Sequence, residues 1–152
     1  MKNRLIFGLI TAALLVFVTI MTVRSLSDTN TKGRDSKLED IVFEGGKVNI
    51  YVFWGDGCPH CADLFEFLET AKDEYGKYFN LYKFEVWYNK ENAKLLNDFS
   101  VILEDDSARL PYTIIGEKTF SGFGNTMKNT ILNAIMDQVK NNFDVYGIFK
   151  TQ

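Results

Sequence analysis

Apolar residues recur along the chain at spacings that predict alternating strands and helices. Residues 48–53 have strand character. After a short polar stretch the pattern becomes that of an amphipathic helix, with Gly76 as a suitable stop. The apolar stripe of this helix consists of Phe65, Leu68, Ala71 and Tyr75. Residues 81–87 then alternate apolar and polar positions, which predicts a second strand.

The second half of the chain continues this alternation of elements. Asn89 is a suitable cap for a helix, whose apolar positions are Ala93, Leu95, Leu96, Phe99 and Ile102. Residues 111–115 predict an apolar strand, 116–117 a hairpin turn and 118–121 a returning strand. A final helix is predicted over residues 126–140. This order predicts an α/β fold with a mixed central sheet and helices on both faces.

The N-terminal segment has a different pattern. Residues 5–23 form 19 consecutive uncharged and mostly apolar positions. This length is sufficient to span a bilayer and predicts a transmembrane anchor within residues 1–24. A cleaved signal peptide is the alternative, and residues 25–27 would make a tolerable cleavage site, although the apolar regions of signal peptides are usually shorter.

The apolar segment is followed by a linker and one domain. Residues 25–36 are polar, small and of mixed charge, as is typical of a tether. Residues 37–152 then form the predicted globular domain. Basic residues lie on both sides of the apolar segment, so the charge distribution does not settle its orientation.

Composition restricts the kinds of partner that the chain could bind. Hydrophobic residues make up 46% and charged residues 24%, which is ordinary for a globular protein. The net charge of −3 and the lack of a basic stripe do not indicate binding to nucleic acid. No glycine-rich phosphate loop, paired-carboxylate site or Ser/His/Asp set stands out, so the sequence predicts no cofactor.

Both cysteines and the only histidine lie in one stretch, WGDGCPHC, between the first predicted strand and the first helix. Pro59 suits the first turn of a helix, because its missing N–H would have no helical partner there. Cys58 then lies at the helix N-terminus, where free N–H groups and the macrodipole favour a thiolate. Cys61 follows one turn later on the same face, so the two sulfurs can reach each other. Cys58 is therefore the candidate nucleophile, and Cys61 is its resolving partner.

Three other interpretations of the cysteine pair compete with redox chemistry. A zinc site has only His60 as a further S/N ligand, so carboxylates or a second copy of the chain would have to complete it. Haem attachment requires a histidine directly after the second cysteine, where Ala62 stands. A purely structural disulfide across so short a loop removes little entropy from the unfolded chain. The strand–CxxC–helix context favours redox chemistry, and no metal site is predicted.

The Cys-Pro-His-Cys motif resembles the active site of DsbA-type disulfide oxidases of the thioredoxin superfamily, and Trp54 lies where thioredoxins carry a tryptophan before their CxxC. The resemblance extends from about Lys37 to the C-terminus. It implies a thioredoxin-like fold and a cis-proline at Pro111, packed beside the CxxC. It also implies that the backbone of Leu110 contacts an extended client peptide and that Gly122 lies near the active-site surface. Trp54 and Pro111 are expected to belong to the same substrate-binding site.

The sequence departs from this family at two points. The chain between the CxxC and Pro111 is too short for the helical insertion of DsbA-type oxidases, so a thioredoxin-sized domain is expected. Thioredoxins also carry a buried acid six residues before the first cysteine, where this chain has Val52. The resemblance places Lys83 at the position of the lysine that partners this acid. Proton transfer at the resolving cysteine must then use water, Glu85 or another group.

Two functions from different classes remain open. The first is a thiol–disulfide oxidoreductase, held at the cell membrane by a single N-terminal helix, whose catalytic domain acts outside the cytoplasm. Its partners would be client proteins with thiols or disulfides and a redox partner protein. The second is a non-catalytic accessory module that binds peptides in its groove and uses the disulfide only as a redox sensor. Cleavage of the N-terminal segment would make either protein a secreted one.

His60 is predicted to tune the reactive pair. It lies beside Cys58 in the same turn, where its N–H donors or its charge would stabilise a thiolate. Because only the reduced form carries that charge, His60 is expected to make the protein a stronger oxidant. The alternative is an ordinary polar residue in a surface turn.

Overall fold

The structure is a computed structural model that describes residues 35–107 and 109–152. The predicted anchor at residues 1–24 and most of the predicted linker lie outside the described residues. Within the described ranges, none of the helices has both the length and the apolar character needed to cross a membrane.

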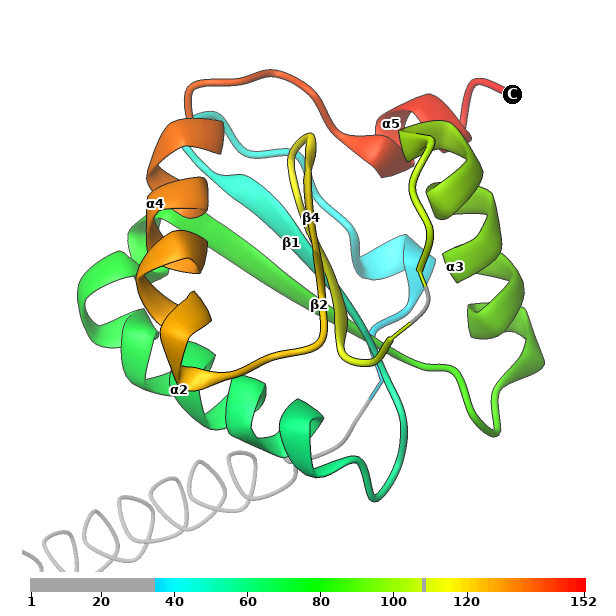
Figure 1. The fold of residues 1–152 in the computed structure, drawn as a ribbon. Helices are drawn as coiled ribbons and strands as arrows, with labels where there is room; N and C mark the ends of the chain where they lie inside the picture. The colour runs from blue at the N-terminus through cyan, green and yellow to red at the C-terminus, as the bar shows by residue number, and fades with distance from the viewer. Residues whose placement is uncertain (1–34, 108) are drawn as a thin grey trace, which may run out of the picture. The chain divides into compact units, whose positions relative to one another are not determined.

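A four-stranded mixed sheet forms the centre of the fold (Figure 1). Its strands are β1 (Val48–Trp54), β2 (Phe79–Glu85), β3 (Tyr112–Ile115) and β4 (Lys118–Ser121). The strand order is β2-β1-β3-β4; β1 and β2 are parallel, and the other two pairs are antiparallel. This is the sheet arrangement that the family resemblance implied.

Helices cover both faces of this sheet (Figure 1). Their bounds are α2 (Pro59–Tyr75), α3 (Lys90–Leu103), α4 (Lys128–Gln138) and α5 (Val145–Phe149). Three short 3-10 helices complete the described elements: η1 (Leu38–Asp40), η2 (Gly76–Tyr78) and η3 (Asn125–Met127). Helices α2 and α4 pack on one face, whereas α3 and α5 pack on the other.

The central strand β1 explains why there are two layers of helices. Ile50 and Val52 point to the α2 and α4 face, and Tyr51 and Phe53 point to the α3 and α5 face. All four side chains are at most 1% exposed. A strand buried on both faces reads as a continuous apolar run, which is the pattern that the sequence shows.

Two elements differ from the sequence prediction. Strand β2 begins and ends two residues earlier than residues 81–87. It begins earlier because Phe79 and Asn80 pair with Val48 and Asn49 of β1, and it ends earlier because the Glu85 side chain binds the amides of the segment that follows it. The five-residue helix α5 was not predicted. Asp144 caps this helix by accepting hydrogen bonds from Tyr146 and Gly147, so an Asp followed by apolar residues was its available signal.

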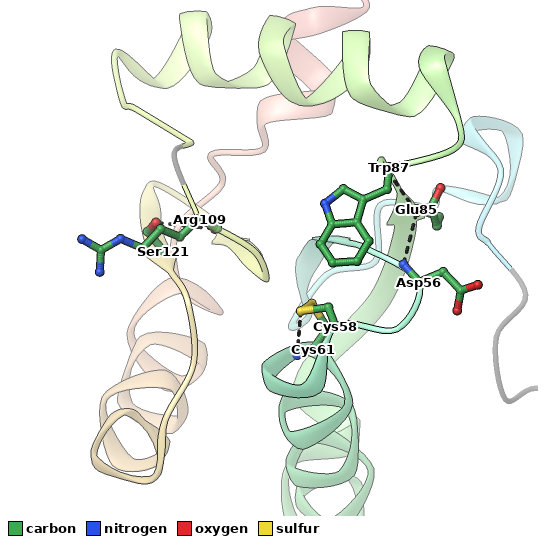
Figure 2. The surroundings of a disulfide bond; sticks show 7 residues. All are labelled: Asp56, Cys58, Cys61, Glu85, Trp87, Arg109 and Ser121. Atoms are coloured by element: carbon green, nitrogen blue, oxygen red, sulfur yellow. Dashed lines mark hydrogen bonds between the residues drawn. A yellow bond between two sulfur atoms is a disulfide. The ribbon is translucent and has the colours of Figure 1, made fainter.

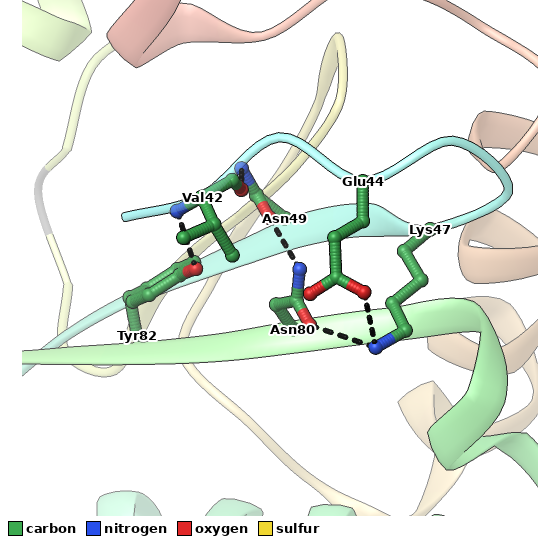
Figure 3. A network of polar contacts seen from close by, with 6 residues as sticks. All are labelled: Val42, Glu44, Lys47, Asn49, Asn80 and Tyr82. Carbon is green, nitrogen blue, oxygen red and sulfur yellow. Dashed lines mark hydrogen bonds and ion pairs between the residues drawn. The ribbon is translucent and has the colours of Figure 1, made fainter. Parts of the chain in front are cut away.

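A polar network lies at the start of β1 (Figure 3). The Asn49 side chain donates to the Val42 carbonyl and accepts from Asn80, at 3.0 and 3.2 Å. The Val42 amide donates to the Tyr82 hydroxyl at 2.9 Å. Lys47 donates to Asn80 and pairs with Glu44. These bonds fix the segment before β1 against the first two strands.

Asp144 extends this network under α5. Its carboxylate accepts from the Tyr51 hydroxyl at 2.8 Å and from the Asn49 amide at 2.9 Å. Burial, followed by the nearby Asp144 carboxylate, raises the pKa of Tyr51, so its hydroxyl remains a donor at neutral pH. One carboxylate thus joins the cap of α5 to the centre of the sheet.

Replacement of Asp144 by alanine should destabilise the domain by about 2–4 kcal/mol, because it removes the helix cap, leaves the buried Tyr51 hydroxyl without its acceptor and removes one of the hydrogen bonds of Asn49. Urea unfolding of the variant measures this loss. Asp106→Ala, at an exposed loop position, is the matched control and should change stability by less than about 0.5 kcal/mol. Equal effects of the two substitutions would contradict a structural role for Asp144.

Candidate active site

The CxxC motif lies where the loop after β1 enters α2. Gly57 has a φ of +82°, which favours glycine, and the Cys58 amide donates to the Gly55 carbonyl at 3.0 Å. Cys58 is the N-cap residue, and its Sγ accepts from the Cys61 amide at 3.3 Å. Pro59 occupies the start of the helix, as the sequence predicted. The chain therefore turns sharply and presents Cys58 at the N-terminus of a 17-residue helix.

Cys58 and Cys61 form a disulfide in this structure. Cys58 is 9% exposed, whereas Cys61 is only 1% exposed. Cys58 is thus the more exposed residue of the pair, and Cys61 lies against the core.

His60 is exposed in the first turn of α2, between the two cysteines. It belongs to the rim of a cavity that also includes Phe67 on α2 and Phe123 from the segment after β4. The first turn of α2 contains no acidic residue. The helix N-terminus therefore keeps its preference for negative charge at Cys58.

Trp54, at the end of β1, contacts two other segments of the domain. Its indole N–H donates to the Asp35 carboxylate at 3.2 Å, and its ring packs edge-on against Phe65 with centroids 5.7 Å apart. Asp35 and Ser36, which the sequence analysis placed in the linker, bind to β2 through hydrogen bonds to Glu85 and Lys83. Trp54 is thus half-buried, and its hydrogen bond to Asp35 holds the start of the domain.

Pro111 lies at the same end of the sheet as the disulfide, because the next residue, Tyr112, pairs with Phe53 on β1. The Leu110–Pro111 bond is cis, as the resemblance implied. Gly122, with a φ of +80°, donates from its amide to the Pro111 carbonyl at 2.9 Å. The side chain of Leu110 packs against the core on the α3 face. The structure therefore places Pro111 and Gly122 next to each other, at the end of the sheet where the disulfide lies.

Val52 occupies the position of the missing acid and is completely buried. Its neighbours in the sheet are Lys83 on β2 and Thr113 on β3. The hydroxyl of Thr113 is buried without a hydrogen-bond partner in the described part of the chain. Lys83 places its ammonium group over the Phe65 ring at 5.0 Å, and burial together with Lys72 lowers its pKa.

Glu85 holds the two loops next to the disulfide. One carboxylate oxygen accepts from the amides of Asp56 and Trp87 at 3.2 and 2.9 Å. The other oxygen accepts from the amides of Tyr88 and Asn89 at 2.9 and 3.1 Å. Burial opposes ionisation, but these four donors outweigh it and lower the pKa of Glu85. At neutral pH the charged Glu85 side chain therefore connects the loop after β1 to the segment after β2; Figure 2 shows its bonds to Asp56 and Trp87.

Trp87 is a residue of the site that the sequence analysis did not single out. Its indole lies directly on Gly55, so closely that a methyl group at that glycine would overlap the ring. The side chain is nevertheless 54% exposed. Figure 2 shows the ring on the side of the loop that faces the disulfide. The only sequence signal was a large apolar residue at a predicted strand end.

The chain matches no protein-family model and no curated protein. It is similar to the solved structure of a thiol:disulfide interchange protein DsbE from Chlorobium tepidum, with 15% identity, a TM-score of 0.49, and coverage of 68% of this chain and 86% of the other. A glutaredoxin from Archaeoglobus fulgidus has 20% identity, a TM-score of 0.43 and coverage of 68% and 97%. A thioredoxin-like protein from Clostridium perfringens has 24% identity, a TM-score of 0.42 and coverage of 64% and 75%.

At these identities and scores the similarities carry no inference about activity. Among residues 35–107 and 109–152, no group of three or more His, Cys, Asp or Glu side chains could hold a metal ion.

Proposed function

We propose that this protein is a thiol–disulfide oxidoreductase that exchanges disulfides with client proteins through Cys58 and Cys61. The observation that carries this proposal is the disulfide at the N-terminus of α2, with Cys58 the more exposed residue of the pair. A purely structural disulfide would not need to lie at a helix N-terminus, where thiolate formation is favoured.

The exchange proceeds in two displacements. A client thiolate attacks Sγ of Cys58, the Cys58–Cys61 bond breaks, and Cys61 leaves as a thiolate that then takes up a proton. A second client thiolate attacks the client sulfur of this mixed disulfide and releases the Cys58 thiolate. The client dithiol has lost two electrons and the protein has gained them; the reverse sequence reduces a client disulfide.

The proposal includes the location of the protein in the cell. The apolar residues 5–23 support a membrane anchor, with the catalytic domain outside the cytoplasm. Disulfide exchange in the oxidising direction has its clients in that compartment. The accessory-module alternative differs in one respect that can be measured, since a module that only binds peptides needs neither cysteine to hold its partner.

Turnover of a dithiol peptide tests the proposed function. In a glutathione buffer the purified protein should accelerate oxidation of the peptide, or reduction of its disulfide, at least about 100-fold over the uncatalysed exchange. Binding of the peptide without acceleration would overturn the proposal in favour of the accessory module. The same assay, run in both directions, shows whether the protein is the better oxidase or reductase.

Substitution of His60 by alanine should make the reduction potential more negative, because the reduced form loses a group that stabilises the Cys58 thiolate. The expected change is about 30 mV, which is a tenfold change in the equilibrium constant. Equilibration of each variant with glutathione measures this change. His60→Asn, which keeps an N–H donor but cannot become charged, separates hydrogen bonding from charge. An unchanged potential in both variants would show that His60 does not tune the pair.

A further inference from the structure

A cavity of about 490 Å³ opens beside the CxxC, between α2 and the segment that leads into α4. His60, Asp63, Glu66 and Phe67 line it from α2, and Phe123 and Lys128 are among the residues that line it from the opposite side. His60 is separated from Cys58 by Pro59 alone. A client attached to Cys58 would therefore have this cavity within its reach.

The cavity has an aromatic floor. The rings of Phe67 and Phe123 are stacked, with centroids 5.6 Å apart. The ammonium group of Lys128 lies over the Phe67 ring at 5.7 Å. The position of Lys128 shows that a positive charge is accommodated beside this ring, because the π electrons attract it.

The wall formed by α2 is acidic. Asp63 and Glu66 are exposed, and neither carboxylate forms an ion pair within the described residues. In contrast, Glu69 on the same helix pairs with Lys72. Two unpaired carboxylates face one lysine, so the charged lining of the cavity favours a cation.

We propose that this cavity binds a cationic side chain of the client, a lysine or arginine close in sequence to the cysteine that reacts with Cys58. The inference rests on the proposed function and names the class of client. Glu66 lies eight residues after Cys58, about 12 Å along the helix at ~1.5 Å per residue. An extended client covers that distance in about four residues. The aliphatic part of its lysine or arginine would pack on the two rings, and the charge would face the carboxylates.

A matched set of peptides tests this inference with the purified protein. Each peptide carries a disulfide to a chromophoric thiol and has Lys, Gln or Glu at the third and fourth positions after its cysteine. Reduced protein should react with the Lys peptide about tenfold faster than with the Glu peptide at low ionic strength. The ratio should decrease in 0.5 M salt, because exposed charges are screened.

Variants assign the preference to the cavity. Combined replacement of Asp63→Asn and Glu66→Gln should reduce the Lys-to-Glu ratio to about twofold, since exposed pairs contribute a fewfold each. Lys128→Gln should increase the ratio, because it removes the competing cation. Asp73→Asn, an exposed position farther along α2, makes a matched charge change and should leave the ratio unaltered.

A neutral disulfide, hydroxyethyl disulfide, is the control for each variant. The rate with this compound reports the reactivity of Cys58 itself, which Asp63 influences because it lies near the helix N-terminus. The rate of each client peptide is therefore divided by the rate with the neutral disulfide. Equal rates for the three peptides, or a ratio that survives the double substitution, would overturn the cationic-client inference and leave the proposed function intact. Failure of every peptide and of the neutral disulfide to react would instead contradict the proposed function.

Discussion

Replacement of Cys61 by alanine is expected to stop turnover, with a loss of at least about 100-fold, and to leave the client bound covalently to Cys58. Cys58 can still form the mixed disulfide, but no second thiol remains to resolve it. Cys61 is 1% exposed and lies against the core, so alanine leaves only a small void there and avoids burying a hydroxyl group. Non-reducing electrophoresis and peptide mass spectrometry measure the trapped complex.

Cys58→Ser is the matched variant for this experiment. Serine is a favourable N-cap residue, and its hydroxyl can accept from the Cys61 amide as the sulfur does, so the start of α2 should remain folded. This variant should lose turnover and form no mixed disulfide. Trapping of the client through Cys61 in Cys58→Ser, at the level seen through Cys58, would contradict the assignment of the two roles.

Replacement of Glu85 by alanine is expected to destabilise the domain by about 3–5 kcal/mol, the second large effect. Four backbone N–H groups lose one shared acceptor, and both loops next to the disulfide lose their brace. Chemical unfolding measures the loss, and turnover of the folded variant should also decrease. Glu74→Ala, at an exposed position in α2, is the control and should change stability by less than about 0.5 kcal/mol.

The dependence of stability on acidic pH gives an independent measure of how much the charged Glu85 side chain stabilises the domain. Its pKa in the folded protein is lower than the ordinary value of 4.5. Its contribution is therefore complete above pH 4.5 and decreases as the pH falls through the folded pKa. The stability difference between wild type and Glu85→Ala should shrink over that acidic range. A difference that stays constant down to pH 2 would contradict a charged brace.

The sequence predicted the part of the site that depends on local chemistry. Pro59 at the first turn of a helix and the spacing of Cys58 and Cys61 follow from capping and helical geometry alone. The cis bond before Pro111 and the position of Gly122 came from the family resemblance, because neither is dictated by neighbouring residues in the chain. The two helical layers followed from the continuous apolar run of β1 and the amphipathic patterns around it.

The remaining parts depend on contacts between distant segments. Asp35, 19 residues before Trp54, binds the indole N–H of that residue, a contact that no local pattern indicates. Glu85 terminates β2 by accepting bonds from residues beyond it, so the alternation of residues 81–87 predicted the end of the strand incorrectly. The cavity beside His60 is lined by Phe67 and Phe123, whose stacking no local pattern indicates.

Equilibration of the wild-type protein with glutathione buffers of graded ratio tests the central claim most directly. The fraction of reduced Cys58–Cys61 pair is measured by alkylation and mass at each ratio. A pair that cycles with clients should interconvert reversibly, with a two-electron midpoint between about −270 and −120 mV, the range of dithiol–disulfide oxidoreductases. A midpoint potential more negative than about −300 mV is typical of a structural disulfide and would contradict this account.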